Sequence, residues 1–185
     1  KKLSIETSKT TEERHAFLDR LRESPIAQDT GKANEQHYEV PAAFYKLVLG
    51  PNLKYSCSYW PRDCESLAAA EEAALKQIED RAQLTDHQNV LDLGCGWGSF
   101  SLWAAPRYPN SNFLAVSNSH SQATHIREQA TSRGIDNLKV VTCDVNEFSP
   151  DMVFDRIVSV EMLEHARNYE KLFERISSWM HDDAT

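Results

Sequence analysis

The chain has 185 residues, and 41% of them are hydrophobic, which suits about one globular domain with a core of its own. Its formal net charge of −8 argues against a general affinity for nucleic acid or for an anionic membrane surface. No apolar run approaches the ~20 residues that a membrane-spanning helix needs, so we expect no membrane span.

The four cysteines are Cys57, Cys64, Cys95 and Cys143, and none of them forms a C-x-x-C pair. This spacing predicts neither a zinc site nor a disulfide framework, so we expect no metal. Reduced thiols are typical of intracellular proteins. The first residues contain no apolar stretch of the kind found in signal peptides. We therefore expect a cytoplasmic location.

Residues 1–88 are predicted to form an N-terminal helical layer on the substrate side. Thr10-x-x-Glu13 is a capping box that opens the first helix. Residues 24–36 are polar and predict a loop. Two more helices are expected over residues 41–50 and about 66–82. The apolar residues that should share one face of these two helices are Phe44, Leu47, Val48, Leu67, Ala74, Leu75 and Ile78.

From residue 89 onward the pattern changes to alternating strands and helices. Strands are expected at 90–93, 113–116, 138–143 and 156–160, and helices at about 99–105, 121–133 and 169–180. Such alternation predicts a parallel sheet with right-handed crossovers. The fold class is therefore α/β.

The first of these strands leads directly into a glycine-rich turn. Asp92 is followed by Gly94, Gly96 and Gly98 in the pattern G-x-G-x-G. Glycines leave room for a ligand close to the backbone, and the dinucleotide fingerprint would be G-x-G-x-x-G. The pattern here resembles the first motif of the Rossmann-like S-adenosylmethionine-dependent methyltransferases. Taken alone, it could also be a plain glycine-rich turn.

Three further segments, residues 34–41, 53–57 and 158–169, make the resemblance more specific. Together they are similar to the family that contains cyclopropane fatty-acid synthases, mycolic acid cyclopropane synthases and coclaurine N-methyltransferases. The coclaurine N-methyltransferase branch is the more similar one. That branch has a glutamate where Glu161 stands, whereas the cyclopropane synthases usually have glycine. The stretch 117–119 also resembles the N-methyltransferase branch.

This resemblance implies that the chain binds S-adenosyl-L-methionine (SAM) and releases S-adenosyl-L-homocysteine (SAH). It implies that Tyr55 and Ser56 meet the methionine end, that Gly94 and Gly96 lie under it, that Ser117 and Gln122 hold the ribose, and that Asp144 and Val145 flank the adenine. Residues at the ends of parallel strands face the ligand crevice of such sheets. Asp144 could instead be a helix cap or a turn residue.

The resemblance also implies three catalytic residues, Glu161, Glu164 and His165. If the chain turns helical after the fourth strand, Glu161 faces Glu164 at i+3 and His165 at i+4. A carboxylate could attract a protonated amine and take its proton, and histidine could pass the proton on. In the other view, Glu164 is a helix-start acid and His165 a surface imidazole.

Tyr38 and Cys57 are predicted in the substrate pocket. In the cyclopropane synthases the cysteine that corresponds to Cys57 helps hold a bicarbonate ion together with the glutamate that corresponds to Glu164. Cys57 does not decide between the branches, because the N-methyltransferases carry cysteine there as well. A buried cysteine is more often a packing residue.

The methyltransferase sheet that the chain resembles has seven strands in the order 3-2-1-4-5-7-6, and only four are predicted here. We therefore expect residues 89–185 to be the first half of the SAM-binding domain, and the 185-residue chain to be inactive alone. The edge at residues 156–160 should pair with another chain or with a missing C-terminal half. Three functions remain: N-methylation of a small amine, cyclopropanation or methylation of a lipid acyl chain, and non-catalytic cofactor binding.

Overall fold

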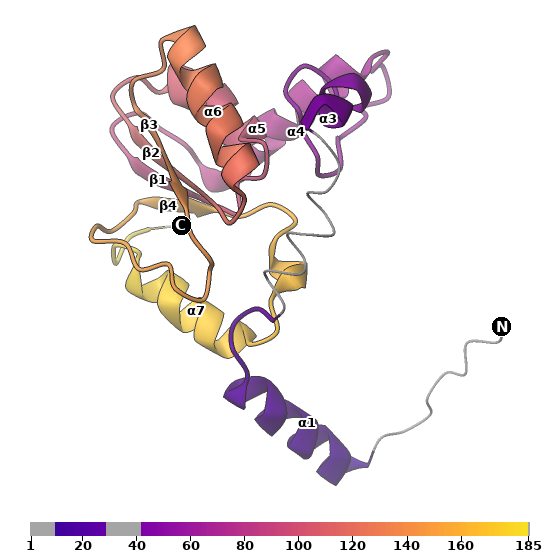
Figure 1. Ribbon diagram of the computed structural model, residues 1–185, viewed down its shortest axis with the longest axis vertical. Coiled ribbons are helices and arrows are strands. Elements are labelled where there is room, and N and C mark those ends of the chain that lie inside the picture. The colour runs from indigo at the N-terminus through magenta and orange to yellow at the C-terminus, as the bar shows by residue number, and fades with distance from the viewer. Residues whose placement is uncertain (1–9, 29–41, 185) are drawn as a thin grey trace, which may run out of the picture.

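The protein folds around a four-stranded parallel sheet, seen in the computed structural model of Figure 1. The structure describes residues 10–28 and 42–184. The strand order is β3-β2-β1-β4, which confirms the predicted α/β class and the predicted order of these strands. The strands are β1 (Asn89–Leu93), β2 (Asn112–Ser117), β3 (Leu138–Thr142) and β4 (Arg156–Val158).

β4 ends at Val158, two residues before the predicted end. Its pairing with β1 also ends there, at Asp92 opposite Val158. The side-chain hydroxyl of Ser159 donates to the carbonyl of Leu93 at 2.8 Å. A side chain therefore takes the place of a backbone donor at this point, and the chain leaves the ladder earlier than its apolar sequence indicates.

Three helices cover one face of the sheet, namely α4 (Leu67–Ala82), α5 (Ser99–Ala104) and α6 (His120–Arg133). The short helix η1 (Ala105–Arg107) extends α5. Leu75, Phe100 and Ile126 come from the three helices and pack in one buried apolar cluster with residues of all four strands. Burial of such side chains stabilises the fold by roughly 1.5–3 kcal/mol each. This face contains the larger core.

Helix α7 (Tyr169–Ser178) covers the opposite face (Figure 1). There Leu91 and Leu93 of β1 pack with Phe154 and with Trp179, which follows α7. Arg175 reinforces this layer because its guanidinium donates to the carbonyls of residues 145, 146 and 148. Both faces of β1 are thus buried, as a central parallel strand requires.

Helix α1 (Thr11–Glu23) begins with the predicted capping box, in which Thr10 and Glu13 bond to each other's backbone amides at 3.3 and 2.7 Å. No residue of α1 is buried. Its C-terminal end is held beside α7 through an ion pair of 2.8 Å between Arg22 and Glu170. Asn168 adds two donor bonds to the carbonyls of residues 22 and 24.

Helix α3 (Ala42–Val48) forms where a helix was predicted, but the predicted inward face is wrong. Phe44, Leu47 and Val48 are exposed, and Tyr45 is the buried residue. The reason is that the Tyr45 ring packs against the ring of Trp97, with 5.2 Å between the centroids. Leu67, also predicted inward, lies at the first turn of α4 and is exposed.

The edge of β4 that faces away from β1 has one further contact. Phe154 forms an isolated parallel bridge with Met180. The amide of Phe154 donates to the carbonyl of Trp179 at 2.8 Å, and its carbonyl accepts from His181 at 3.1 Å. The segment after α7 therefore begins to align with the chain just before β4.

None of the helices in residues 10–28 and 42–184 has the length and apolar character that crossing a membrane requires. The same residues contain no group of three or more His, Cys, Asp or Glu side chains arranged to hold a metal ion.

Candidate functional site

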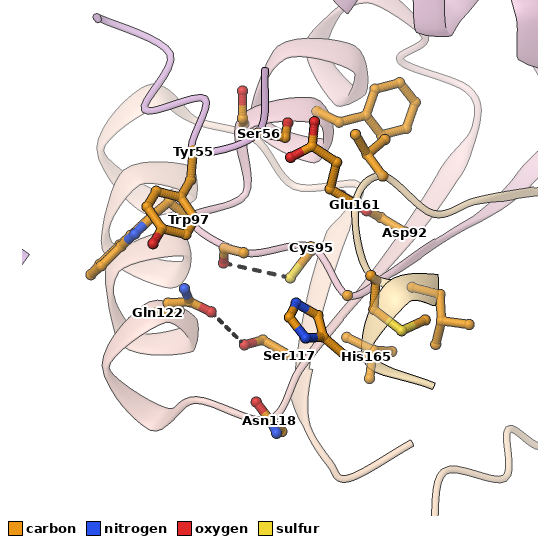
Figure 2. Close-up of a pocket in the computed structure, with 18 of the residues that line it drawn as sticks. Tyr55, Ser56, Asp92, Cys95, Trp97, Ser117, Asn118, Gln122, Glu161 and His165 are labelled. Atoms are coloured by element: carbon orange, nitrogen blue, oxygen red, sulfur yellow. Dashed lines mark hydrogen bonds between the residues drawn. The ribbon is translucent and has the colours of Figure 1, made fainter. Parts of the chain in front are cut away.

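A cavity of about 380 Å³ lies at the carboxyl ends of β1, β2 and β4 (Figure 2). This is the edge at which parallel α/β sheets bind ligands. The segments that line it include the loop 53–56, the β1–α5 turn, the β2–α6 connection, residues 143 and 145 after β3, and the loop that follows β4. Ten of the thirteen predicted site residues line it, namely Tyr55, Ser56, Gly94, Gly96, Ser117, Gln122, Val145, Glu161, Glu164 and His165.

The β1–α5 turn lies at the centre of this wall. The amides of Gly94 and Cys95 both donate to the carbonyl of Val116, at 3.0 and 2.9 Å, and tie the turn to β2. A Cβ atom on Gly98 would lie 2.6 Å from the Ile126 side chain. Gly96 has φ +52°, and a Cβ atom there would have no heavy atom within 4 Å. Among the three glycines of the turn, only Gly96 has open space where a side chain would be, because a Cβ atom on Gly94 would meet Met162.

Ser117 and Gln122 form a buried polar pair at the β2 side of the cavity. The Ser117 hydroxyl donates to Gln122 Oε1 at 2.8 Å and accepts from the amide of Ser119 at 3.1 Å. Figure 2 shows this bond as a dashed line between Gln122 and Ser117. The side-chain amide nitrogen of Gln122 carries two hydrogens that could be donated to a hydroxyl of a ligand.

The aromatic side chains of Tyr45, Tyr55 and Trp97 also line the cavity. Tyr45 packs edge-on against Tyr55 with a centroid distance of 5.2 Å, and Trp97 packs edge-on against His125 at 5.5 Å. Burial is the main cause that lowers the pKa of His125. Tyr55 lines the cavity and is 57% exposed, so it lies between the cavity and solvent. The rings join α3, the loop 53–56 and the β1–α5 turn.

The segment after β4 brings Glu161, Glu164 and His165 to one cavity, but not by the predicted helix. The helix-like turn η2 begins only at Leu163 (Leu163–His165), and Glu161 has the left-handed φ of +49°. The predicted i+3 and i+4 facing of Glu161 required a helix that includes this residue, so it is wrong. In Figure 2 the Glu161 carboxylate points toward Ser56.

A long-range hydrogen bond fixes the Glu161 carboxylate. Its Oε1 accepts from the amide of Cys57 at 2.9 Å. A non-glycine residue in the left-handed region costs roughly 1–3 kcal/mol and is found preferentially at functional sites. The bond to Cys57 is a local interaction that holds this conformation.

Asp144 and Cys57 are not among the residues that line the cavity. Asp144 accepts from the amide and the side-chain nitrogen of Asn146, at 2.7 and 2.9 Å, as a turn residue does. Its placement beside an adenine ring stays a prediction. Cys57 reaches the site through its backbone, and its side chain is exposed. Tyr38 lies outside the described residues.

The structure adds Asp92 to the residues that line the cavity. Its carboxylate is 3% exposed and accepts from the Ser101 hydroxyl at 2.6 Å. Burial, opposed by this hydrogen bond, raises the pKa of Asp92 to about 6. The sequence showed Asp92 next to the glycines, but burial of a carboxylate is not visible in the local pattern.

Sequence analysis missed a second buried group, Lys54, which also lines the cavity. Lys54 is 5% exposed, and its Nζ donates to Ser56 Oγ and to the Cys57 carbonyl. The fully buried Glu71 of α4 accepts from the amides of Asn52 and Lys54 at 2.9 and 3.2 Å. The only sequence signal was a lysine directly before Tyr55-Ser56.

Comparisons with known proteins agree with this architecture. The family model described as mycolic acid cyclopropane synthetase matches residues 27–185. (S)-coclaurine N-methyltransferase from Thalictrum flavum subsp. glaucum is 42% identical over 163 residues, which are 88% of this chain and 45% of that protein. Tetrahydroprotoberberine N-methyltransferase from Eschscholzia californica is 36% identical over 91% of this chain and 48% of that protein.

Among solved structures, coclaurine N-methyltransferase bound to N-methylheliamine and SAH aligns with a TM-score of 0.86 at 39% identity, over 96% of this chain and 52% of that chain. A mycolic acid cyclopropane synthase complexed with SAH and CTAB aligns with a TM-score of 0.72 at 28% identity, over 80% and 52%. The chain spans about half the length of these relatives.

The raised pKa of Asp92 predicts a pH dependence of stability. Folded protein keeps a proton that the unfolded chain releases above its ordinary pKa of 3.8, so the free energy of unfolding falls as the pH rises from about 4 to about 6. Asp92→Asn removes this titration while keeping an oxygen that can accept from Ser101. Relative to the wild type, the variant should gain up to about 3 kcal/mol over this window.

Urea denaturation at pH 4, 5, 6 and 7 measures this gain. Asp136→Asn is the matched control, because Asp136 is exposed in the connection between α6 and β3. The control should follow the wild type at every pH. If Asp92→Asn also runs parallel to the wild type, Asp92 is not the titrating group.

Proposed function

The chain belongs to the mycolic acid cyclopropane synthetase family, and from this we propose that it is a SAM-dependent methyltransferase that N-methylates a small amine. The observation that carries the choice of an amine is Glu161. Its carboxylate lines the cavity and is held there by the Cys57 amide. An anionic group in this place suits a cationic amine and offers nothing to an acyl chain. The relatives named as N-methyltransferases support the same choice.

The residues of the cavity fit SAM. The open space over Gly96 leaves room for a ligand close to the backbone. Ser56 and Tyr55 would hold the methionine end, Ser117 with Gln122 would hold the ribose, and the adenine would lie near Val145 and Asp144. SAM supplies an activated methyl group when bound. Two similar structures were solved with SAH bound.

The protein's own part in the reaction is to position and deprotonate the acceptor. Most alkyl amines are protonated near neutral pH, whereas methyl transfer needs a free lone pair on nitrogen. Glu161 and Glu164 attract the ammonium group, and Glu164 accepts its proton directly or through a water molecule. His165, one residue further along η2, passes the proton to solvent. Holding the amine on the transfer line supplies much of the remaining rate.

A second candidate is modification of a lipid acyl chain, by cyclopropanation or methylation. It is favoured by the family match and by the structural similarity to a mycolic acid cyclopropane synthase. Cys57 beside Glu161 is compatible with this chemistry as well. An N-methylated amine among the products of the intact protein would support the first candidate, and a cyclopropyl or methyl-branched lipid would support the second.

We extend the proposal to location and assembly. All four cysteines are free, which suits a reducing compartment such as the cytoplasm. The free edge of β4 is paired in the intact protein, either by a further part of the same chain or by another chain. The bridge between Phe154 and Met180 supports this, because it begins a parallel pairing on that edge.

The cofactor assignment predicts a difference between two glycines. Gly96 and Gly134 both have positive φ, and a Cβ atom on either would have no heavy atom within 4 Å. Gly134 ends α6, whereas only Gly96 lines the cavity. Valine at either position bears a backbone cost of roughly 1–2 kcal/mol, but only Gly96→Val should abolish SAH binding measured by calorimetry. Equal SAH affinities, or a wild type that binds NAD instead, would contradict the assignment.

The acid–base assignment predicts that Glu164→Gln in the intact protein loses turnover and keeps SAH affinity. Removal of a general base costs ~10²–10⁴-fold in rate, and the carboxylate acts on the acceptor. Glu174→Gln is the control, because Glu174 is exposed on α7. A parallel loss of SAH affinity would make Glu164 structural. Amine methylation that survives Glu161→Gly would weaken the amine assignment.

Pairing of the β4 edge predicts slow amide exchange. Because Asp155 donates toward Asn89 on β1, the amides of Arg156 and Val158 point to the opposite edge. Hydrogen exchange of the intact protein should show both amides protected. Exchange as fast as that of residues 151–153 would show that nothing covers this edge.

A further inference from the structure

Lys54 is a buried cation whose surroundings are specific. Its side chain is 5% exposed, and its Nζ donates to Ser56 Oγ at 2.6 Å and to the Cys57 carbonyl at 2.7 Å. Burying a charge is costly unless hydrogen bonds and nearby charges compensate it. Burial lowers the pKa of Lys54, and electrostatic interactions with Glu161, Cys57 and Glu71 oppose this shift.

The loop that carries Lys54 is itself anchored from α4. The buried carboxylate of Glu71 accepts from the amides of Asn52 and Lys54. A Cβ atom on Gly50 would lie 2.6 Å from that carboxylate, so the loop and α4 approach each other as closely as glycine allows. These contacts hold the Lys54 backbone in place, so the position of its side chain is restricted as well.

The direction of the two bonds from Lys54 matters for the cavity. An ammonium group can only donate, whereas a serine hydroxyl has one hydrogen and two acceptor sites. With its oxygen already accepting from Lys54, Ser56 has its single hydrogen left for another acceptor. The second bond, to the Cys57 carbonyl, steadies the segment whose Cys57 amide donates to Glu161.

We propose that Lys54 is a positioning residue that makes Ser56 a hydrogen-bond donor toward the carboxylate of an amino-acid ligand and keeps the Cys57 amide on Glu161. The inference rests on the proposed function, because it takes the ligand's carboxylate to be that of the methionine end of SAM or SAH. Lys54 acts through Ser56 and Cys57 and is not itself a catalytic residue.

The test compares two ligands that differ only at this end. SAH carries the amino-acid carboxylate, and 5′-methylthioadenosine has the same nucleoside and thioether without it. Lys54→Met keeps the length and the burial of the side chain and removes the ammonium. In calorimetry on the intact protein, the variant should lose about 10- to 100-fold in SAH affinity, as expected when a hydrogen bond to a charged group is weakened. Its affinity for methylthioadenosine should stay at the wild-type value.

Two further variants sharpen the comparison. Ser56→Ala should show the same selective loss of SAH affinity. The double variant should lose no more SAH affinity than either single variant, because both substitutions remove the same hydrogen bond from Ser56 to the ligand carboxylate. Ser56→Ala also carries the test if Lys54→Met does not fold. Lys76→Met, at an exposed position of α4, removes a lysine charge elsewhere and should leave both affinities unchanged.

The outcomes separate the inference from the proposed function. A wild type that binds neither nucleoside overturns both. A wild type that binds SAH, with a Lys54→Met variant that binds it equally well, overturns the inference alone. Equal losses for SAH and methylthioadenosine give Lys54 a merely structural role and also overturn it.

Discussion

The site depends on one constraint, which is the close approach of three segments around the β1–α5 turn. The turn is tied to β2 through the Val116 carbonyl, and α6 packs so tightly against Gly98 that any side chain there would meet Ile126. These contacts fix the turn, and Gly96 then leaves open space above it. Dense packing beneath the turn fixes its position, while Gly96 carries no side chain that would fill the cavity.

A second long-range interaction joins two loops that are far apart in the sequence. Glu161 and Cys57 are 104 residues apart in sequence, and their hydrogen bond of 2.9 Å closes the wall between the loop 53–57 and the loop after β4. Lys54 supports the same wall from within the loop through its bond to the Cys57 carbonyl, and Glu71 supports it from α4. Hydrogen bonds thus connect the strained backbone at Glu161 with the buried cation of Lys54 and the buried carboxylate of Glu71. Such local costs are concentrated where a site must be held rigid.

Local sequence patterns were sufficient for most of the fold. Strand alternation, the capping box at Thr10 and the glycine turn are short-range signals, and each is found in the structure. The failures have a different origin. The inward face of α3 is decided by the packing of Tyr45 on Trp97, and the conformation of Glu161 is decided by a distant amide. The role of Lys54 depends on burial, which one residue in a loop does not reveal. Long-range contacts determine these features, so short windows of sequence could not predict them.

We propose that this cavity holds SAM with its methyl group directed at an amine beside Glu161 and Glu164. A crystal structure of the intact protein with SAH and an amine product tests it most directly. We expect the homocysteine carboxylate at Ser56, the adenine near Val145, and the amine nitrogen between the SAH sulfur and the Glu164 carboxylate. SAH bound elsewhere, or an amine on the side of the sulfur away from Glu161 and Glu164, would contradict it.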